Sequence, residues 1–281
     1  MADPVTGQPP NDYLNRKQLV RSEAYGDTIL RTLLDTLLLD SVFSLTDDFT
    51  GPFDGNRWGW GASESADTGF HVIDTDTGHL AASAGQSDDG AVWLFEQQPR
   101  WSPRKRCLTQ ARVDIASVTS LKFEYGFVSA AINLNDVNID GAVALKATPT
   151  ANTFMDAFAV SIYDVDDDTN LSLVQNLNGA LTSADQSGPA ALASGTHTLL
   201  VAMNEGGGAL FWLNGIKAGQ VQGDPADRIA DNGTMTSVVE SKHATTGVYG
   251  LWFFLQNRAA SAGQRVRIDY IHARQDRATV N

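Results

Sequence analysis

The residues of this chain that could do the most specific chemistry form a short acidic run, DVDDDTN. Asp164, Asp166 and Asp168 alternate in it, which resembles the start of a calcium-binding loop because Ca²⁺ prefers carboxylate and amide oxygens. An EF-hand loop also needs glycine at its sixth position and glutamate at its twelfth, where this chain has Thr169 and Gln175. The run therefore predicts either a negatively charged turn or a looser calcium site, and no other cofactor is expected.

Tryptophans are the second kind of residue with a possible binding role, because their rings can stack on sugars. Trp58 and Trp60 lie in a glycine-rich stretch that predicts a turn, and Trp101 lies beside a basic loop. These three residues form a candidate carbohydrate platform, with packing at a sheet edge or a subunit contact as the alternative. The other tryptophans lie in apolar stretches and are expected in the core: Trp93, Trp212 and Trp252.

No catalytic residue can be assigned from motifs. The five histidines are scattered and lack zinc-ligand spacing, and the sequence has neither a serine nucleophile elbow nor a phosphate-binding glycine loop. The single cysteine, Cys107, excludes a framework of intrachain disulfides and is expected to be buried. We therefore expect a protein that is not an enzyme.

The net charge of −13 argues against binding to DNA or RNA, which requires clustered lysine and arginine. One short basic cluster is an exception, RWSPRKRC, and it predicts a solvated loop or a dock for an acidic neighbour. The sequence has no apolar run long enough to span a membrane and no pattern of a secretory signal at its start, so we expect synthesis in a cytoplasm.

The segment DTILRTLLDTLLLD, residues 27–40, is the most apolar helix-like stretch of the chain. Its apolar residues recur at helical spacing and form a stripe over about half of the helix circumference. An exposed stripe of this size is rare in soluble monomers, so something must cover it. The cover is either the chain's own sandwich or another polypeptide, and we favour the second. The residues of the stripe are Ile29, Leu30, Leu33, Leu34, Leu37 and Leu38.

The elements expected around these residues fall into three parts. Residues 1–11 are rich in proline, glycine and asparagine and predict an extended arm, and residues 12–41 predict an α-helix that anchors the chain. Residues 42–281 contain about twelve short strand-like stretches separated by turn residues, which is typical of an antiparallel two-sheet sandwich. In the last stretch, alternation places Val266, Ile268 and Tyr270 on one face. The fold class is therefore all-β, with an N-terminal arm and helix.

Three motifs resemble the concanavalin A-like lectin/glucanase superfamily, a two-sheet jelly roll also found in laminin G-like domains. They are the opening DDFTGPFDGNRWGWG (47–61), the late hairpin HTLLVAMNEGGGALFWLNGIKAG (197–219) and the closing strand VRIDYIHAR (266–274). The resemblance covers residues 45–275 and implies a jelly-roll fold. It also implies two functions to test: sugar binding, with calcium held on acidic loops, and glycoside hydrolysis.

Glucanases of this superfamily carry their acids on one strand as E-x-D-x-x-E, and this chain has no such spacing. Glu96, Glu124, Glu205 and Glu240 are isolated, and Asp114 lacks a glutamate partner at the required positions. A retaining glycosidase needs two carboxylates that face one cleft. Hydrolysis is therefore the least favoured of the alternatives.

An arm and helix joined to a jelly-roll head resemble the architecture of bacteriophage virion proteins, such as capsid decoration or tail and fibre subunits. This resemblance predicts a non-enzymatic structural protein of the virion, assembled in the host cytoplasm. The expected partners are further copies of the chain, for example in a trimer, or other virion proteins. A calcium-assisted carbohydrate-binding module is the alternative, and a glycoside hydrolase ranks below it.

Overall fold

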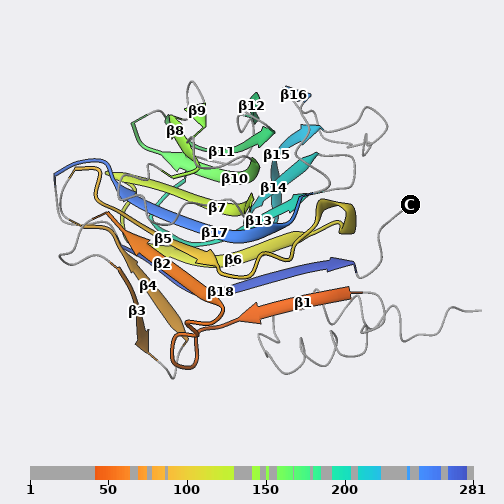
Figure 1. The fold of residues 1–281 in the computed structure, drawn as a ribbon. Coiled ribbons are helices and arrows are strands. Elements are labelled where there is room, and N and C mark those ends of the chain that lie inside the picture. Colours follow the sequence, from red (N-terminus) through yellow and green to blue (C-terminus); the bar gives the residue numbers. More distant parts are fainter. Residues whose placement is uncertain are drawn as a thin grey trace, which may run out of the picture.

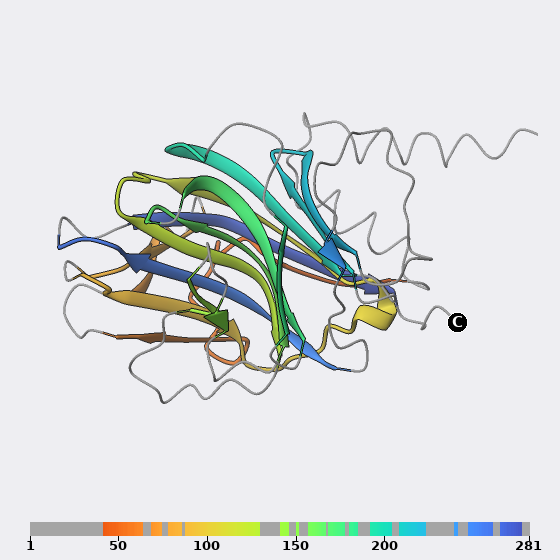
Figure 2. The ribbon, with the colours of Figure 1, turned by 90° about the horizontal axis from the view of Figure 1, so that it is seen from above.

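The structure is a computed structural model, which describes most of the chain after residue 41. The described residues are 42–63, 69–74, 78–85, 88–129, 141–145, 150–151, 157–166, 168–177, 180–184, 192–203, 208–222, 239–240, 247–260 and 265–276. The predicted arm, the predicted helix and the apolar stripe lie outside these residues. The described part forms an all-β sandwich of two sheets, which face each other and curve together in Figures 1 and 2.

Sheet A has nine strands, and all of its pairs are antiparallel except β15 with β16. Residues 265–268 of β18 pair with β4, and residues 271–276 pair with β1. Strands β4 and β1 therefore lie one after the other along the same edge of β18. The order across the sheet is β16 (Val239–Glu240), β15 (Ile216–Gln222), β14 (Ala209–Leu213), β13 (Gly195–Met203), β6 (Leu108–Ile115), β18 (Arg265–Asp276), β4 (His79–Ser83) and β3 (Gly69–Asp74), with β1 (Val42–Asp47) beside β18.

Sheet B has seven antiparallel strands, and two short strands form a separate pair. The order of sheet B is β12 (Ala180–Ala184), β11 (Asp168–Leu177), β10 (Ala157–Asp164), β7 (Leu121–Ser129), β17 (Tyr249–Asn257), β5 (Ala91–Glu96) and β2 (Trp58–Ala62). The short pair is β8 (Val143–Leu145) with β9 (Thr150–Ala151). A single 3₁₀ turn, η1 (Pro103–Lys105), is the helical element of the described part.

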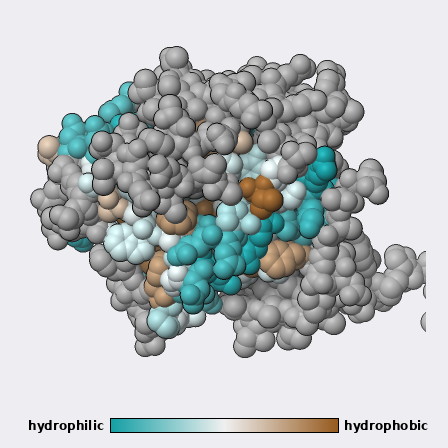
Figure 3. Space-filling model, viewed as in Figure 1, coloured by the Kyte–Doolittle hydropathy of each residue, from teal (hydrophilic) through white to brown (hydrophobic). Residues whose placement is uncertain are grey.

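The main core lies between the sheets, and alternation along β7 shows how the sequence builds it. Leu121, Phe123, Tyr125 and Phe127 point into this core. The residues between them point to the outer face of sheet B, yet Lys122, Glu124, Gly126 and Val128 are buried too. Sheet B is therefore covered on both faces at its centre. The outer faces of β6 and β18 carry exposed arginines instead, and the described surface seen in Figure 3 is mostly hydrophilic with separate hydrophobic spots.

Three local expectations were wrong. Trp212, which was expected in the core, is half-buried on the outward side of β14. The register of β18 shifts between Ile268 and Tyr270 against β6, so Ile271 instead of Tyr270 continues the core face. The stretch WGWGA is not a turn but the edge strand β2. Its glycines lie under aromatic rings of β5: a Cβ at Gly59 would overlap Phe95, and one at Gly61 would overlap the indole of Trp93. A larger residue at either position would force a ring to move, because the rings occupy the space of a side chain.

Candidate functional site

The outer face of sheet B carries a second apolar cluster, separate from the core between the sheets. Aromatic side chains of β5, β10 and β17 form much of it, and Ala142 and Val143, at the start of β8, pack with them. All of its members are at most 9% exposed. They are Ala91, Trp93, Phe95, Val128, Ala142, Val143, Phe158, Val160, Ile162, Val174, Trp252 and Phe254.

Glu124 lies in the middle of this cluster and is fully buried. Its carboxylate accepts three hydrogen bonds: the backbone N–H groups of Ala142 and Val143 donate at 2.7 and 3.0 Å, and the indole N–H of Trp252 donates at 2.9 Å. Three charge-assisted donors on one buried carboxylate hold its position firmly. Glu124 thereby fastens residues 142–143 to the centre of sheet B.

Lys122 is the next outward residue on β7 and completes this attachment. Its ammonium group donates to the carbonyl of Val143 at 2.7 Å and lies 5.4 Å from the centre of the Phe254 ring. Glu124 thus accepts from the N–H groups of residues 142–143, and Lys122 donates to the carbonyl of Val143 in the same stretch of backbone. We call Lys122 and Glu124 the β7 clip.

Gly141 lets the covering segment approach the clip. Its φ of 83° lies in the left-handed region, and a Cβ there would overlap the carboxylate of Glu124. Ala142 and Val143 follow and are fully buried in the cluster. The sequence Gly-Ala-Val therefore supplies the backbone freedom, the small size and the apolar side chain that close contact with the sheet needs.

Burial raises the pKa of Glu124, while the charge of Lys122 and the three N–H donors act in the opposite direction. The register places apolar residues opposite Glu124 on both neighbouring strands, Phe254 on β17 and Ile162 on β10. Retaining glycosidases hold two carboxyl groups about 5–5.5 Å apart. Glu124 is the only acid of β7, and neither directly opposed residue supplies a second carboxylate.

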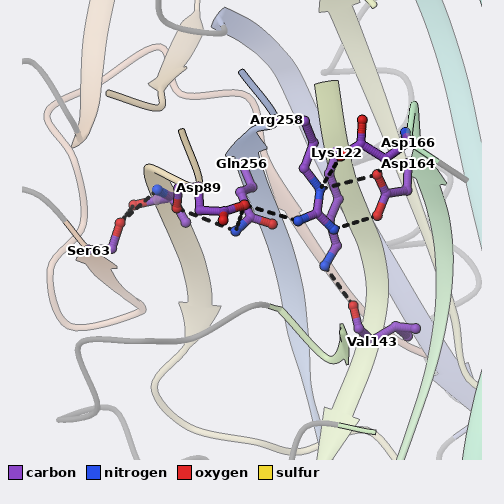
Figure 4. A network of polar contacts seen from close by, with 9 residues as sticks. Ser63, Asp89, Lys122, Val143, Asp164, Asp166, Gln256 and Arg258 are labelled. Atoms are coloured by element: carbon purple, nitrogen blue, oxygen red, sulfur yellow. Dashed lines mark hydrogen bonds and ion pairs between the residues drawn. The ribbon is translucent and has the colours of Figure 1, made fainter. Parts of the chain in front are cut away.

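An arginine, Arg258, contacts the acidic run in which a calcium site was predicted. Figure 4 shows Arg258 between the acidic turn after β10 and Asp89, and the guanidinium contacts both oxygens of Asp164 at 3.2 and 2.6 Å. It also pairs with Asp89 at 3.1 Å and approaches Asp166 at 3.9 Å. Asp164 is 1% exposed, so Arg258 supplies the positive charge and the hydrogen bonds that this buried carboxylate needs.

The other two members of the run, Asp166 and Asp168, are described only in part. The carboxylate of Asp166 is 64% exposed, and the side chain of Asp168 lies outside the described residues. Within the described ranges, no group of three or more His, Cys, Asp or Glu side chains is arranged to hold a metal ion.

The three candidate sugar-stacking tryptophans separate into two kinds. Trp58 and Trp101 are at most 1% exposed, and their indole N–H groups donate to Asp47 and Glu96 at 2.7 and 2.6 Å. Both are core residues with satisfied polar groups, so a sugar cannot reach their rings. Trp60 is 48% exposed on the edge strand β2 and is available for stacking.

A second buried glutamate, Glu96, fixes the loop that follows β5. Besides the bond from Trp101, its carboxylate pairs with the guanidinium of Arg100 at 2.8 Å and accepts the N–H of Leu251 at 3.4 Å. Burial raises the pKa of Glu96, against the hydrogen bond of Trp101 and the charge of Arg100. These bonds to Glu96 fix Arg100 and Trp101, the first two residues of the basic cluster, in place.

In the sequence Glu124 looks like an isolated acid, and its structural role cannot be recognised there. Its hydrogen-bond partners are 18, 19 and 128 positions away, so no local motif could reveal them. A usable signal was present in KFEYGFV, where charged residues alternate with aromatic ones although the stretch predicts a buried strand. A buried charge in such a strand needs a partner, and Lys122 two residues before Glu124 supplies an opposite one.

Comparisons with known proteins identify the fold. No protein-family model matches the chain, and no curated protein matches it. Solved structures with the concanavalin A-like jelly roll do match. SCLam, a non-specific endo-β-1,3(4)-glucanase from family GH16, is 12% identical with a TM-score of 0.53, over 85% of this chain and 92% of that chain.

Two further structures have the same fold. The endo-β-1,3-glucanase from Pyrococcus furiosus is 8% identical with a TM-score of 0.52, over 83% of this chain and 93% of that one. The carbohydrate recognition domain of Emp46p in its potassium-bound form is 10% identical with a TM-score of 0.50, over 82% and 95% of the two chains. The expected fold, an all-β concanavalin A-like sandwich, is confirmed, and identities this low show the fold alone.

The described residues include no helix that is long and apolar enough to cross a membrane.

Proposed function

We propose that this chain is a non-enzymatic protein whose sandwich acts as a rigid binding or structural head. The observation that carries the proposal is the bonding of Glu124. Its two carboxylate oxygens accept three N–H groups of the protein itself, and the segment that donates two of them covers the face. A catalytic acid needs hydrogen-bond reach to a substrate. The β7 clip uses its acid to hold the fold together.

This proposal is tested by assaying the full chain on mixed-linkage and β-1,3-glucans. No product above the blank is expected, for wild type and for Glu124→Gln alike. Turnover by the wild type would overturn the proposal, and its loss in Glu124→Gln would point to Glu124 as the acid involved.

We extend the proposal to the virion. In this account the head belongs to a capsid decoration or tail-associated subunit, and the apolar stripe anchors it to further copies of the chain or to another virion protein. Support comes from the amphipathic pattern of residues 27–40 and from a proline-rich arm before it. Leu33→Asp with Leu37→Asp is expected to leave a folded head that no longer joins its assembly. Wild-type occupancy of this double variant would contradict the anchor.

Carbohydrate binding is the second candidate, and the exposed ring of Trp60 is the observation that favours it. The similar structures include glucanases and a carbohydrate recognition domain, which is consistent with this candidate. A glycan array would show binding that Trp60→Ala removes. Ile216→Ala is the matched control, because Ile216 is a different exposed apolar residue, at 58%. An array without signal for the wild type would reject this candidate.

A further inference from the structure

The outer face of sheet A carries an apolar patch next to the strand that follows the apolar stripe. The patch crosses three neighbouring strands in register: Leu200 lies opposite Trp212, and Ala202 lies opposite both Leu210 and Leu108. Leu108, Leu200, Ala202 and Trp212 are half-buried, and Leu210 is 6% exposed. We call these five residues the sheet A patch.

The row of residues through this patch leads directly to β1. Leu108 lies opposite Arg274 of β18, and Arg274 lies opposite Ser44 of β1. Only Ser41 separates the end of the apolar segment, Asp40, from the first residue of β1. The segment therefore joins the sandwich at the edge of sheet A, two residues along β1 from the row through Ser44, Arg274 and Leu108.

The dimensions of the segment and of the face agree. From β1 to β14 there are four strand spacings, about 19 Å at ~4.8 Å each. A helix over the fourteen residues 27–40 would be about 21 Å long. A helix that turns over the edge at Ser41 therefore reaches across β18, β6 and β13 to β14.

The chemistry also agrees. The stripe offers isoleucine and leucine side chains to a patch of leucine, alanine and tryptophan, and contact would remove both surfaces from water. Beside the patch, the exposed Arg274 offers a cation, and Asp35 and Asp40 lie in the segment outside its stripe. Opposite charges at the rim of an apolar contact favour one orientation of the segment.

We propose that, before assembly, the apolar stripe of residues 27–40 docks on the sheet A patch of the same molecule. Docking keeps the stripe out of water in the free chain, and an assembly partner would have to compete with the patch for it. The inference holds whether or not the stripe later binds a virion protein, because it concerns the free subunit.

Thiol labelling of the full chain tests this docking. Ala202→Cys places a thiol in the patch, and the native Cys107 is fully buried and reports only unfolding of the head. Labelling of Ala202→Cys is expected to be about tenfold faster with Leu33→Asp and Leu37→Asp, because the stripe no longer protects the patch. The matched control, Thr32→Asp with Thr36→Asp, adds the same charge outside the stripe and should leave labelling slow.

Further controls separate the possible outcomes. Thr196→Cys lies exposed on the same strand and should label at one rate in every background. Equal labelling of Ala202→Cys with and without the stripe substitutions overturns the proposal. Protection that is lost when the chain is diluted to a monomer also overturns it, because the occupant is then a second copy. If the double aspartate variant precipitates, the labelling rate of Leu33→Cys is compared with and without Leu200→Asp. This comparison disrupts the patch and places the thiol in the stripe. None of these results depends on the assembly assay.

Discussion

The indole N–H of Trp252 donates a hydrogen bond to the carboxylate of Glu124 at 2.9 Å, although 128 positions separate the two residues. This bond joins the two central strands of sheet B on its outer face. The same carboxylate binds the backbone of Ala142 and Val143, so one side chain connects β7, β17 and the covering segment.

Glu124→Gln is expected to lower the free energy of unfolding by about 1–3 kcal/mol, because an amide offers one acceptor oxygen where the carboxylate offers two. The measurement is denaturant unfolding at pH 7. Asp269→Asn is the matched carboxylate-to-amide control in a surface ion pair with Arg112, and should cost less than about 1 kcal/mol. Equal effects of the two substitutions would show that the clip does not stabilise the fold.

Gly141→Ala tests the covering segment. The left-handed φ costs any non-glycine residue about 1–3 kcal/mol, and the added methyl group also overlaps Glu124. Gly215→Ala isolates the backbone cost, because its φ of 79° is similar and a Cβ there meets nothing within 4 Å. Hydrogen exchange at residues 141–145 should accelerate in Gly141→Ala alone. Matching exchange in both variants would contradict the contact.

The pH dependence of stability follows from the raised pKa values of Glu96 and Glu124. A folded state with a raised carboxyl pKa holds its proton more tightly than the unfolded chain does. These two groups therefore make the protein less stable as pH rises from the unfolded value of 4.5 through the folded pKa. The double variant Glu96→Gln with Glu124→Gln should lose this part of the slope in unfolding experiments at several pH values. An unchanged slope would refute the assignment.

Arg258→Ala should lower the free energy of unfolding by about 3–5 kcal/mol, because it leaves the buried carboxylate of Asp164 without its cation. Arg112→Ala, in a more exposed ion pair, is the control. Because Arg258 occupies both oxygens of Asp164, calcium or a chelator should leave the wild-type Tm unchanged. A Tm that rises with calcium would contradict this expectation and support the calcium site predicted from the acidic run.

The fold class could be predicted because it depends on local features. Turn residues at regular spacing and alternating strands indicated an all-β sandwich, and most of the expected stretches coincide with strands. The edge strand β2 was missed because its glycines gain their cover from rings of β5, more than thirty positions away. The shift at Tyr270 was missed because the prediction continued the alternation of inward and outward side chains, which a β-bulge interrupts after Ile268.

The candidate site was harder to predict, because burial and partner identity are properties of the packed structure. Trp58, Trp60 and Trp101 look alike in the sequence, and only packing separates the exposed ring from the two core rings. Arg258 was not linked to the acidic run, because it lies 94 positions after Asp164. The apolar stripe and its partners remain predictions, since residues 27–40 lie outside the described part of the chain.

The most direct test of the central claim is sugar release from β-1,3- and mixed-linkage glucans by the purified full chain, measured beside Glu124→Gln. We predict release at the level of the blank for both proteins, together with a lower unfolding midpoint for the variant. Sugar release by the wild type above the blank would contradict the account, and its loss in a Glu124→Gln protein that is still folded would make Glu124 a catalytic acid.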